Sequence, residues 1–255
     1  MPHTVSWHYH LQMFCGKPRP VPTNRRRLLP LKCPSRFHIS VLVCVISCCV
    51  VSAHSQQTIV PTVSFTFDFP GSDPDHYAIS VSEDGNASYD STSKLSPESA
   101  AGDSYHSDFT VSQATQARVF DLAKRAHYFE GQTESKSKNQ AFTGTKTLTY
   151  KDAQKSTRAS YNNSPAPAVQ ELTAFFQALS TTLEFGHRLD YYLRYQKLAL
   201  DEELKKMEEM SNAGRLEEIS SVAPVLQKIA DDPAVIKLVR ARAERLLQAA
   251  ESRRK

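Results

Sequence analysis

Hydrophobic and polar residues alternate in the segment TVSFTFDF (62–69) and again in HYAISVSE (76–83). A period of two residues is typical of a β-strand that buries one face. The turn residues DGN (84–86) stand between the second of these strands and ASYD (87–90). Because Asp, Gly and Asn tolerate positive φ, we predict that the chain reverses there as a β-hairpin.

A similar order of elements follows further along the chain. A short strand, YHSDFTV (105–111), precedes a helix for which Ser112 is a suitable N-cap, and the apolar positions recur at helical spacing as far as about His127. FTGTKTLTY (142–150) and KSTRASY (155–161) then predict a second hairpin.

A second helix is predicted to begin near Pro167, since proline is tolerated in the first turn of a helix. Its apolar residues form one stripe, made of Val169, Leu172, either Phe175 or Phe176, Leu179 and Leu183. Hairpins alternating with amphipathic helices favour an α+β fold, with antiparallel hairpins, two helices packed on the sheet, and an all-helical C-terminal arm after them.

The arm begins at His187, after which no strand pattern remains. We predict one long helix whose apolar stripe consists of Leu189, Leu193, Gln196, Leu200, Leu204 and Met207, and which ends near Gly214. A second helical segment is expected over 216–230, and a last helix with Asp232 as its N-cap and Pro233 as its first residue.

The N-terminal part of the chain has the order of a secretory signal. Five Lys and Arg residues lie in 25–36, the segment 39–51 is apolar, and Ala53 and Ser55 are small residues at the −3 and −1 positions. This order predicts cleavage between Ser55 and Gln56. The apolar segment is too short to span a bilayer comfortably, so we expect no membrane span after the signal is removed.

An alternative for the same segment is a poor lipobox in which Cys48 is lipidated. Either interpretation predicts a secreted or periplasmic protein. The predicted organisation is therefore an extension with a signal peptide over 1–55, an α+β domain over 56–186 and the helical arm over 187–255.

Removal of the signal changes the composition. Residues 1–55 contain seven Lys or Arg and no Asp or Glu, so the formal net charge falls from +4 to −3 when they are lost. This disfavours a nucleic-acid partner, which would require a basic face. All five cysteines also lie in this segment, so the mature chain cannot be a disulfide scaffold and must be stabilised by core packing.

Candidate chemistry is sparse in the mature chain, and we predict no catalytic residue, no cofactor and no metal ligand. His187 and Asp190 share a helix face at i,i+3, a spacing that could orient an imidazole but is common by chance. Asp68, Asp73 and Asp75 lie close together, but they lack the spacing of a calcium loop and suit the turns they occupy.

The candidate contact surface lies on the arm. Tyr191 and Tyr195 alternate with Arg188 and Arg194, residue types that are enriched where protein surfaces recognise partners. Leu200 lies in the apolar stripe, which needs a cover, either a partner or a second copy of the chain. In the competing interpretation Tyr192 and Tyr195 fill the junction with the α+β domain, and the last helix folds back over the stripe as a hairpin.

Three segments, YAISVSEDGNASY (77–89), FTGTKTLTY (142–150) and YNNSPAPAVQELTAFF (161–176), together with the export signal and the charged helical tail, resemble exported bacterial proteins of unknown function. The resemblance covers about residues 62–210 and is one of pattern. It implies export and brings no activity, cofactor or catalytic residue.

Two functional hypotheses follow from the sequence. The first is a non-enzymatic extracytoplasmic interaction or scaffold module that uses the helical arm as its contact surface. The second is an extracytoplasmic enzyme or small-ligand-binding protein whose site is built from scattered polar residues such as Asp68, Tyr77, His127 and Arg158.

Overall fold

The computed structural model describes residues 59–94, 103–131, 133–136 and 139–254. These residues belong to one compact unit, Ser55–Lys255. The strands are β1 (Thr62–Asp68), β2 (His76–Ser82), β3 (Asn86–Ser93), β4 (Asp103–Thr110), β5 (Thr145–Lys151) and β6 (Ser156–Tyr161). The α-helices are α1 (Gln113–Arg125), α2 (Pro167–Tyr195), α3 (Leu200–Asn212), α4 (Ala223–Asp231) and α5 (Lys237–Arg254). Short 3-10 helices are η1 (His127–Phe129), η2 (Lys197–Ala199) and η3 (Ile219–Val222).

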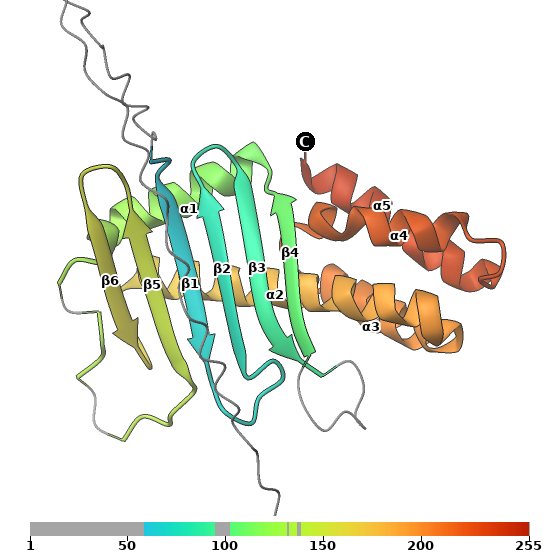
Figure 1. Ribbon diagram of the computed structural model, residues 1–255, viewed down its shortest axis with the longest axis horizontal. Coiled ribbons are helices and arrows are strands. Elements are labelled where there is room, and N and C mark those ends of the chain that lie inside the picture. The colour runs from blue at the N-terminus through green and yellow to red at the C-terminus, as the bar shows by residue number, and fades with distance from the viewer. Residues whose placement is uncertain (1–58, 95–102, 132, 137–138, 255) are drawn as a thin grey trace, which may run out of the picture. The chain divides into compact units, whose positions relative to one another are not determined.

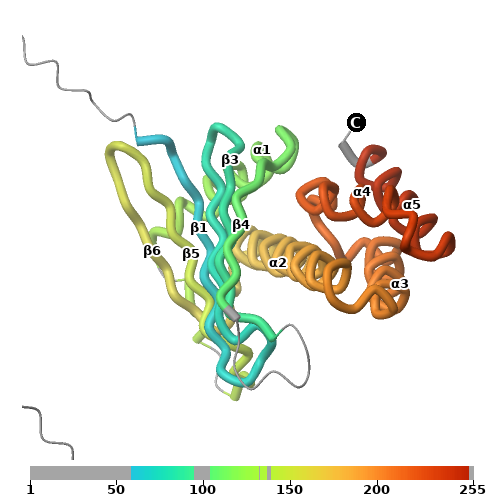
Figure 2. Tube along the Cα trace, turned by 45° about the vertical axis from the view of Figure 1, so that its right-hand side comes forward, coloured from blue at the N-terminus to red at the C-terminus, as the bar shows by residue number. Residues whose placement is uncertain are grey.

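The six strands form one antiparallel sheet in the order β4-β3-β2-β1-β5-β6. Figure 1 shows that α1 and the first part of α2 lie behind the sheet, and in Figure 2 all the helices lie on one side of it. The α+β fold class and the packing of two helices on antiparallel hairpins are therefore confirmed.

Alternation along each strand explains the two different faces of the sheet. Val63, Phe65 and Phe67 of β1 are buried beneath the helices, and Phe65 stacks on Phe176 of α2 with ring centroids 5.3 Å apart. The opposite face is rich in serine and threonine, several of which bond to one another across strands, such as Ser80 and Ser88 at 2.7 Å. An antiparallel sheet covered on one face only produces this alternation.

Helix starts follow the predicted capping chemistry. The hydroxyl oxygen of Ser112 accepts a hydrogen bond from the backbone N–H of Thr115 at the start of α1, and α2 begins at Pro167. The predicted stripe of α2 is buried in the core, and both of the alternatives Phe175 and Phe176 belong to it. Both predictions are confirmed because N-capping and amphipathic periodicity are local properties.

The C-terminal helices form the arm, seen to the right of β4 in Figure 1. The end of α2 runs outward, α3 returns toward the sheet, α4 runs outward again and α5 returns. Because α2 continues without a break past residue 187, the predicted border between domain and arm falls inside one helix. None of the helices within the described residues is both long enough and apolar enough to cross a membrane.

The predicted single helix after His187 is wrong. The chain leaves α2 at Gln196, with φ −143° and ψ 58°, and passes through η2 before α3 begins at Leu200. Leu189 and Leu200 then both become fully buried, one on each side of the turn. No glycine or proline marks this turn, so the helical periodicity concealed it.

The last helix also starts later than predicted. A carboxylate oxygen of Asp232 accepts a hydrogen bond from the backbone N–H of Ala234 at 2.8 Å, and the N–H of Val235 donates to the carbonyl of Asp232 at 3.0 Å. These bonds make a turn rather than a helix start, and α5 begins at Lys237. The Asp-Pro pair is equally suited to a turn, which explains the error.

Candidate interaction surface

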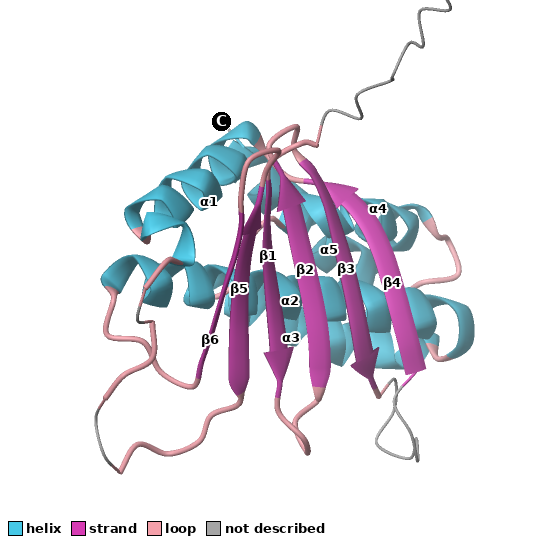
Figure 3. Ribbon diagram, turned by 60° about the vertical axis from the view of Figure 1, so that its left-hand side comes forward, coloured by secondary structure: helices cyan, strands magenta, loops and turns pink. Residues whose placement is uncertain are grey.

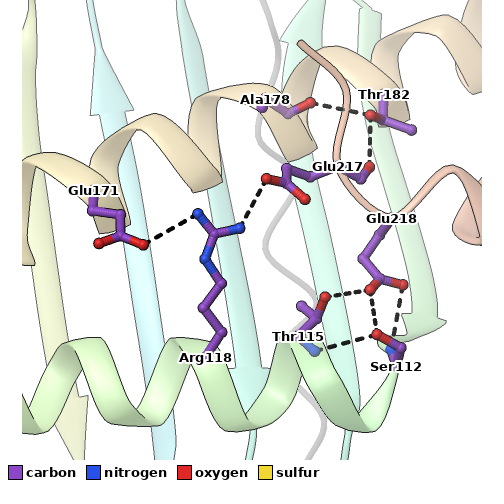
Figure 4. Close-up of polar contacts among 8 residues, drawn as sticks. All are labelled: Ser112, Thr115, Arg118, Glu171, Ala178, Thr182, Glu217 and Glu218. Atoms are coloured by element: carbon purple, nitrogen blue, oxygen red, sulfur yellow. Dashed lines mark hydrogen bonds and ion pairs between the residues drawn. The ribbon is translucent and has the colours of Figure 1, made fainter. Parts of the chain in front are cut away.

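The arm is attached to the sheet layer through the segment between α3 and η3. Glu218 reaches across to the start of α1, where one oxygen of its carboxylate accepts hydrogen bonds from the hydroxyls of Ser112, at 2.6 Å, and Thr115. Its other oxygen lies 3.3 Å from the backbone nitrogen of Ser112 (Figure 4). An acidic group at a helix N-terminus satisfies free backbone N–H groups and is favoured by the helix dipole.

Glu217, the preceding residue, strengthens the same attachment. Its carboxylate lies 2.9 Å from a guanidinium nitrogen of Arg118 in α1, and Arg118 also contacts Glu171 of α2 at 3.3 Å (Figure 4). The hydroxyl of Thr182 donates to the backbone carbonyl of Glu217 at 2.8 Å. Two consecutive residues thus contact both α1 and α2, and they hold this end of the arm against the two helices. We refer to these contacts of Glu217 and Glu218 as the clasp.

The apolar stripe of the arm is covered within the chain. Leu200, Leu204 and Met207 are fully buried, and α5 packs on α3 as the last helix returns. The fold-back interpretation therefore accounts for the cover. Leu200 belongs to the core and is out of reach of a partner in this structure, which corrects its prediction as a contact residue.

Charged pairs fix the pairing of α3 with α5. The guanidinium of Arg242 lies 3.0 Å from Asp201 and 2.8 Å from Glu208, and Arg245 lies 2.5 Å from Glu208. Arg245 and Arg242 together hold the pKa of Glu208 below its usual range, against the opposing effect of its partial burial. These contacts specify which faces of the two helices meet.

The two predicted contact arginines have partners inside the arm. Arg188 donates from Nε to Glu203 at 2.7 Å, and its guanidinium lies 5.0 Å from the ring centroid of Phe185. Arg194 lies 2.5 Å from Asp190 one helical turn earlier. Arg188 therefore joins α2 to α3, whereas Arg194 stays on the exposed surface of α2.

Tyr191 and Tyr195 lie together at the end of α2, as predicted for a tyrosine cluster. Their ring centroids are 5.1 Å apart, and the ring of Tyr192 lies 5.8 Å from that of Tyr191. Tyr195 is 69% exposed, so this side chain is available at the surface. Tyr192 is half-buried against the core, so the junction interpretation fits Tyr192 but not the exposed Tyr195.

The distal end of the arm gathers exposed apolar side chains from two turns. The Nζ atom of Lys197, in the turn between α2 and α3, lies 2.6 Å from a carboxylate oxygen of Asp232, in the turn between α4 and α5. Beside this ion pair, Leu198 is 93% exposed and Ile236 is 60% exposed. We call Tyr195, Leu198, Ile236 and Leu238 the distal patch; Figure 1 shows both turns at the end of the arm that points away from the sheet.

A buried polar cluster between α2 and the sheet was missed by sequence reasoning. One carboxylate oxygen of Glu184 accepts hydrogen bonds from the hydroxyls of Tyr89 and Ser91, each at 2.7 Å. Among the described residues, its other oxygen has no hydrogen-bond partner and lies 3.9 Å from Nδ1 of His187. The ring of His187 stacks on the ring of Tyr105, with centroids 3.8 Å apart. A clue was available, since Glu184 and His187 continue the buried face of α2.

The electrostatics of Glu184 follow from these neighbours. Burial by itself would raise the pKa of this carboxyl, but His187 and the hydroxyls of Ser91 and Tyr89 outweigh burial, so the pKa lies below its usual range. The i,i+3 spacing of His187 and Asp190 makes no ion pair among the described residues, and Asp190 contacts Arg194 instead.

The residues proposed for an enzyme or ligand site are not brought together. Figure 3 shows the helices behind the sheet, on one of its faces. Tyr77 is buried beneath the helices, whereas Asp68 and Arg158 are exposed on the opposite face of the sheet. His127 is exposed in η1, after α1. Alternation along the strands separates Tyr77 from the other two.

The predicted cleavage residues, Ser55 and Gln56, and the alternative lipidation residue, Cys48, lie outside the described residues. No protein-family model matches this sequence, and neither does any curated protein. The surface of the arm and the sites described above are therefore the features of this chain that indicate a function.

Proposed function

We propose that this protein is an exported, non-enzymatic interaction module that contacts a protein partner, or a second copy of itself, through the distal patch of the helical arm. The observation that carries this proposal is the gathering of apolar side chains at one end of the arm. Four of the seven large hydrophobic residues that are exposed in the described part of the chain belong to the patch, and the ion pair of Lys197 with Asp232 brings together the two segments that carry them. Exposed apolar surface of this kind is typical of interaction sites.

The form of the arm supports the same role. The clasp holds one end of the arm against α1 and α2, and the ion pair of Lys197 with Asp232 joins the two turns at the other end. A patch on helices whose packing is fixed loses little conformational freedom on binding, which favours affinity. Export is supported by the basic, apolar and small-residue order of residues 25–55.

Site-specific photo-crosslinking in the native host tests the proposal. A photoreactive residue at position 198 should give discrete crosslinked products, because Leu198 is almost fully exposed within the patch. The matched control is position 248 on α5, where Gln248 is also exposed but lies toward the other end of that helix. Equal crosslinking from both positions, or none from position 198, would contradict the proposal.

A pair of leucine variants separates contact from folding. Leu198→Ser should abolish the crosslinked or oligomeric species while changing the free energy of unfolding by less than about 0.5 kcal/mol, as for most surface substitutions. Leu200→Ser, two residues later, should destabilise the fold by about 2–5 kcal/mol because Leu200 is fully buried. Sedimentation velocity then shows whether the partner is a second copy of the chain.

A further inference from the structure

A cavity of about 350 Å³ lies far from the arm, where the ends of β5 and β6 meet the first half of α2. Its walls include Lys146 of β5, Asn162 and Asn163 after β6, and Ala174 and Gln177 of α2. Small-molecule sites are usually concave and begin at about 300 Å³. None of the residues of the scattered-site hypothesis lines this cavity.

Lys146 carries a charge that is unusual for its surroundings. Its side chain is only 6% exposed, and Nζ donates to the backbone carbonyls of Asn162 at 2.9 Å and of Thr143 and Gly144 at 3.1 Å. Within the described residues, no carboxylate forms an ion pair with it. Glu134, a nearby acid, instead accepts a hydrogen bond from the backbone N–H of Asn162 at 2.6 Å.

This arrangement leaves a buried cation without a neutralising partner. Burial lowers the pKa of Lys146, and Glu134 opposes that effect only in part. Buried ammonium groups are costly unless an opposite charge or enough hydrogen-bond acceptors surround them. Backbone carbonyls keep Lys146 in place, but they supply dipoles rather than the full negative charge that would compensate it.

One of the acceptors around the ammonium can be exchanged for a ligand atom. Nζ shares its three hydrogens among four oxygen atoms within 3.1 Å, three carbonyls and the hydroxyl of Thr143 at 3.0 Å, so a carboxylate oxygen can take the place of that hydroxyl as the fourth acceptor. That hydroxyl has a second partner, Oδ1 of Asn162 at 3.2 Å, so it can give up Nζ without losing all its hydrogen bonds. The amides of Asn163 and Gln177, which line the cavity, supply further donors for a polar ligand.

We propose that this cavity binds a small molecule through a carboxylate group, with Lys146 as its counter-ion. One buried ammonium matches the single charge of a carboxylate, whereas sites for phosphate usually combine several donors in an arginine fork or a nest of backbone N–H groups. The site lies on the sheet layer and is independent of the distal patch.

The test uses propionate and its neutral isostere propionamide with the full-length chain, observed by saturation-transfer NMR at constant ionic strength. Propionate should give a saturable signal with a Kd in the range of about 1–10 mM, and propionamide should bind about tenfold more weakly. Equal binding of the two ligands, or no saturable propionate signal, would overturn the proposal.

Variants locate the binding. Lys146→Met should abolish the propionate signal, but this variant could also lose its fold, so Ala174→Leu provides an independent measurement. Ala174 is exposed at the cavity wall, so a leucine there reduces the space that a ligand can occupy. Ala174→Leu should weaken propionate binding about tenfold. Ala117→Leu, a matched substitution on the exposed face of α1, should leave propionate binding unchanged. Binding that is unchanged by Ala174→Leu would show that propionate does not occupy this cavity.

Discussion

The carboxylate of Glu218 accepts a hydrogen bond from the hydroxyl of Ser112, 2.6 Å away and 106 positions earlier in the chain. Ser112 is the N-cap of α1, so the clasp adds a second, distant acceptor at a helix start that already has a local one. The position of the arm and the start of α1 therefore depend on the same few hydrogen bonds.

The backbone conformation of Glu218 can be tested by substitution. Glu218 has φ 46° and ψ 52°, in the left-handed region, where a residue with a Cβ atom is strained. Both Glu218→Ala and Glu218→Gly remove the carboxylate, but only the glycine relieves the strain. We expect Glu218→Ala to be less stable than Glu218→Gly by about 1 kcal/mol in urea denaturation. If the two variants are equally stable, the left-handed backbone at this position is refuted.

Gly186 lies where α2 meets η3. A Cβ atom added there would lie 2.4 Å from Cγ1 of Val222, closer than any real contact. Gly186→Ala should therefore destabilise the protein through overpacking, despite the better helix propensity of alanine.

The same substitution should be tolerated when Val222 is shortened. In a Val222→Ala background, the cost of Gly186→Ala should fall by about 1–3 kcal/mol, the range of coupling energies between contacting residues. Thermal or urea denaturation of the four proteins of this double-mutant cycle measures the coupling. Purely additive effects would show that α2 and η3 do not approach each other in this way.

Glu184 should contribute a pH-dependent part of the stability. Because its pKa is lowered in the folded protein, its contribution is fully present above the ordinary value of 4.5 and is lost as the pH falls below it. The stability difference between the wild type and Glu184→Gln, measured by urea denaturation, should therefore be smaller at pH 3 than at pH 7.

The control for this measurement is Glu209→Gln, because Glu209 is exposed on α3 and its carboxylate stays in water. The stability difference for this variant should change less with pH than that for Glu184→Gln. If the Glu184→Gln difference is constant from pH 7 to pH 3, folding does not lower the pKa of Glu184.

Export predicts a specific chemical form of the mature protein. Mass spectrometry of the protein recovered from outside the cytoplasm should find an N-terminus at Gln56, and treatment with iodoacetamide should add no label to cysteine, because all five cysteines precede that position. A lipid-modified N-terminus at Cys48 would support the lipoprotein alternative instead. A cysteine-containing chain found only in the cytoplasm would contradict export.

The sequence by itself determined the local elements of this protein. Alternation in TVSFTFDF and HYAISVSE located β1 and β2, Ser112 located the start of α1, and Pro167 located the start of α2. These signals were readable because strand periodicity, N-capping and proline geometry act over a few residues. The order of hairpins and helices was then enough for the α+β class.

Only the tertiary structure decided where distant residues meet. The break at Gln196 has no local signal, and it is set by the burial of Leu189 and Leu200 on the two sides of a turn. The two turns that carry Leu198 and Ile236 are joined by the ion pair of Lys197 with Asp232, 35 residues apart.

The clasp and the charge of Lys146 depend on the same kind of long-range contact. Glu218 reaches Ser112 only because α3 folds back along α2, and one of the carbonyls around the buried ammonium of Lys146 comes from Asn162, after β6. A single sequence shows which segments are amphipathic and which side chains are charged or small. Which side chains meet across tens of residues is decided by the packing of the helices and strands against one another.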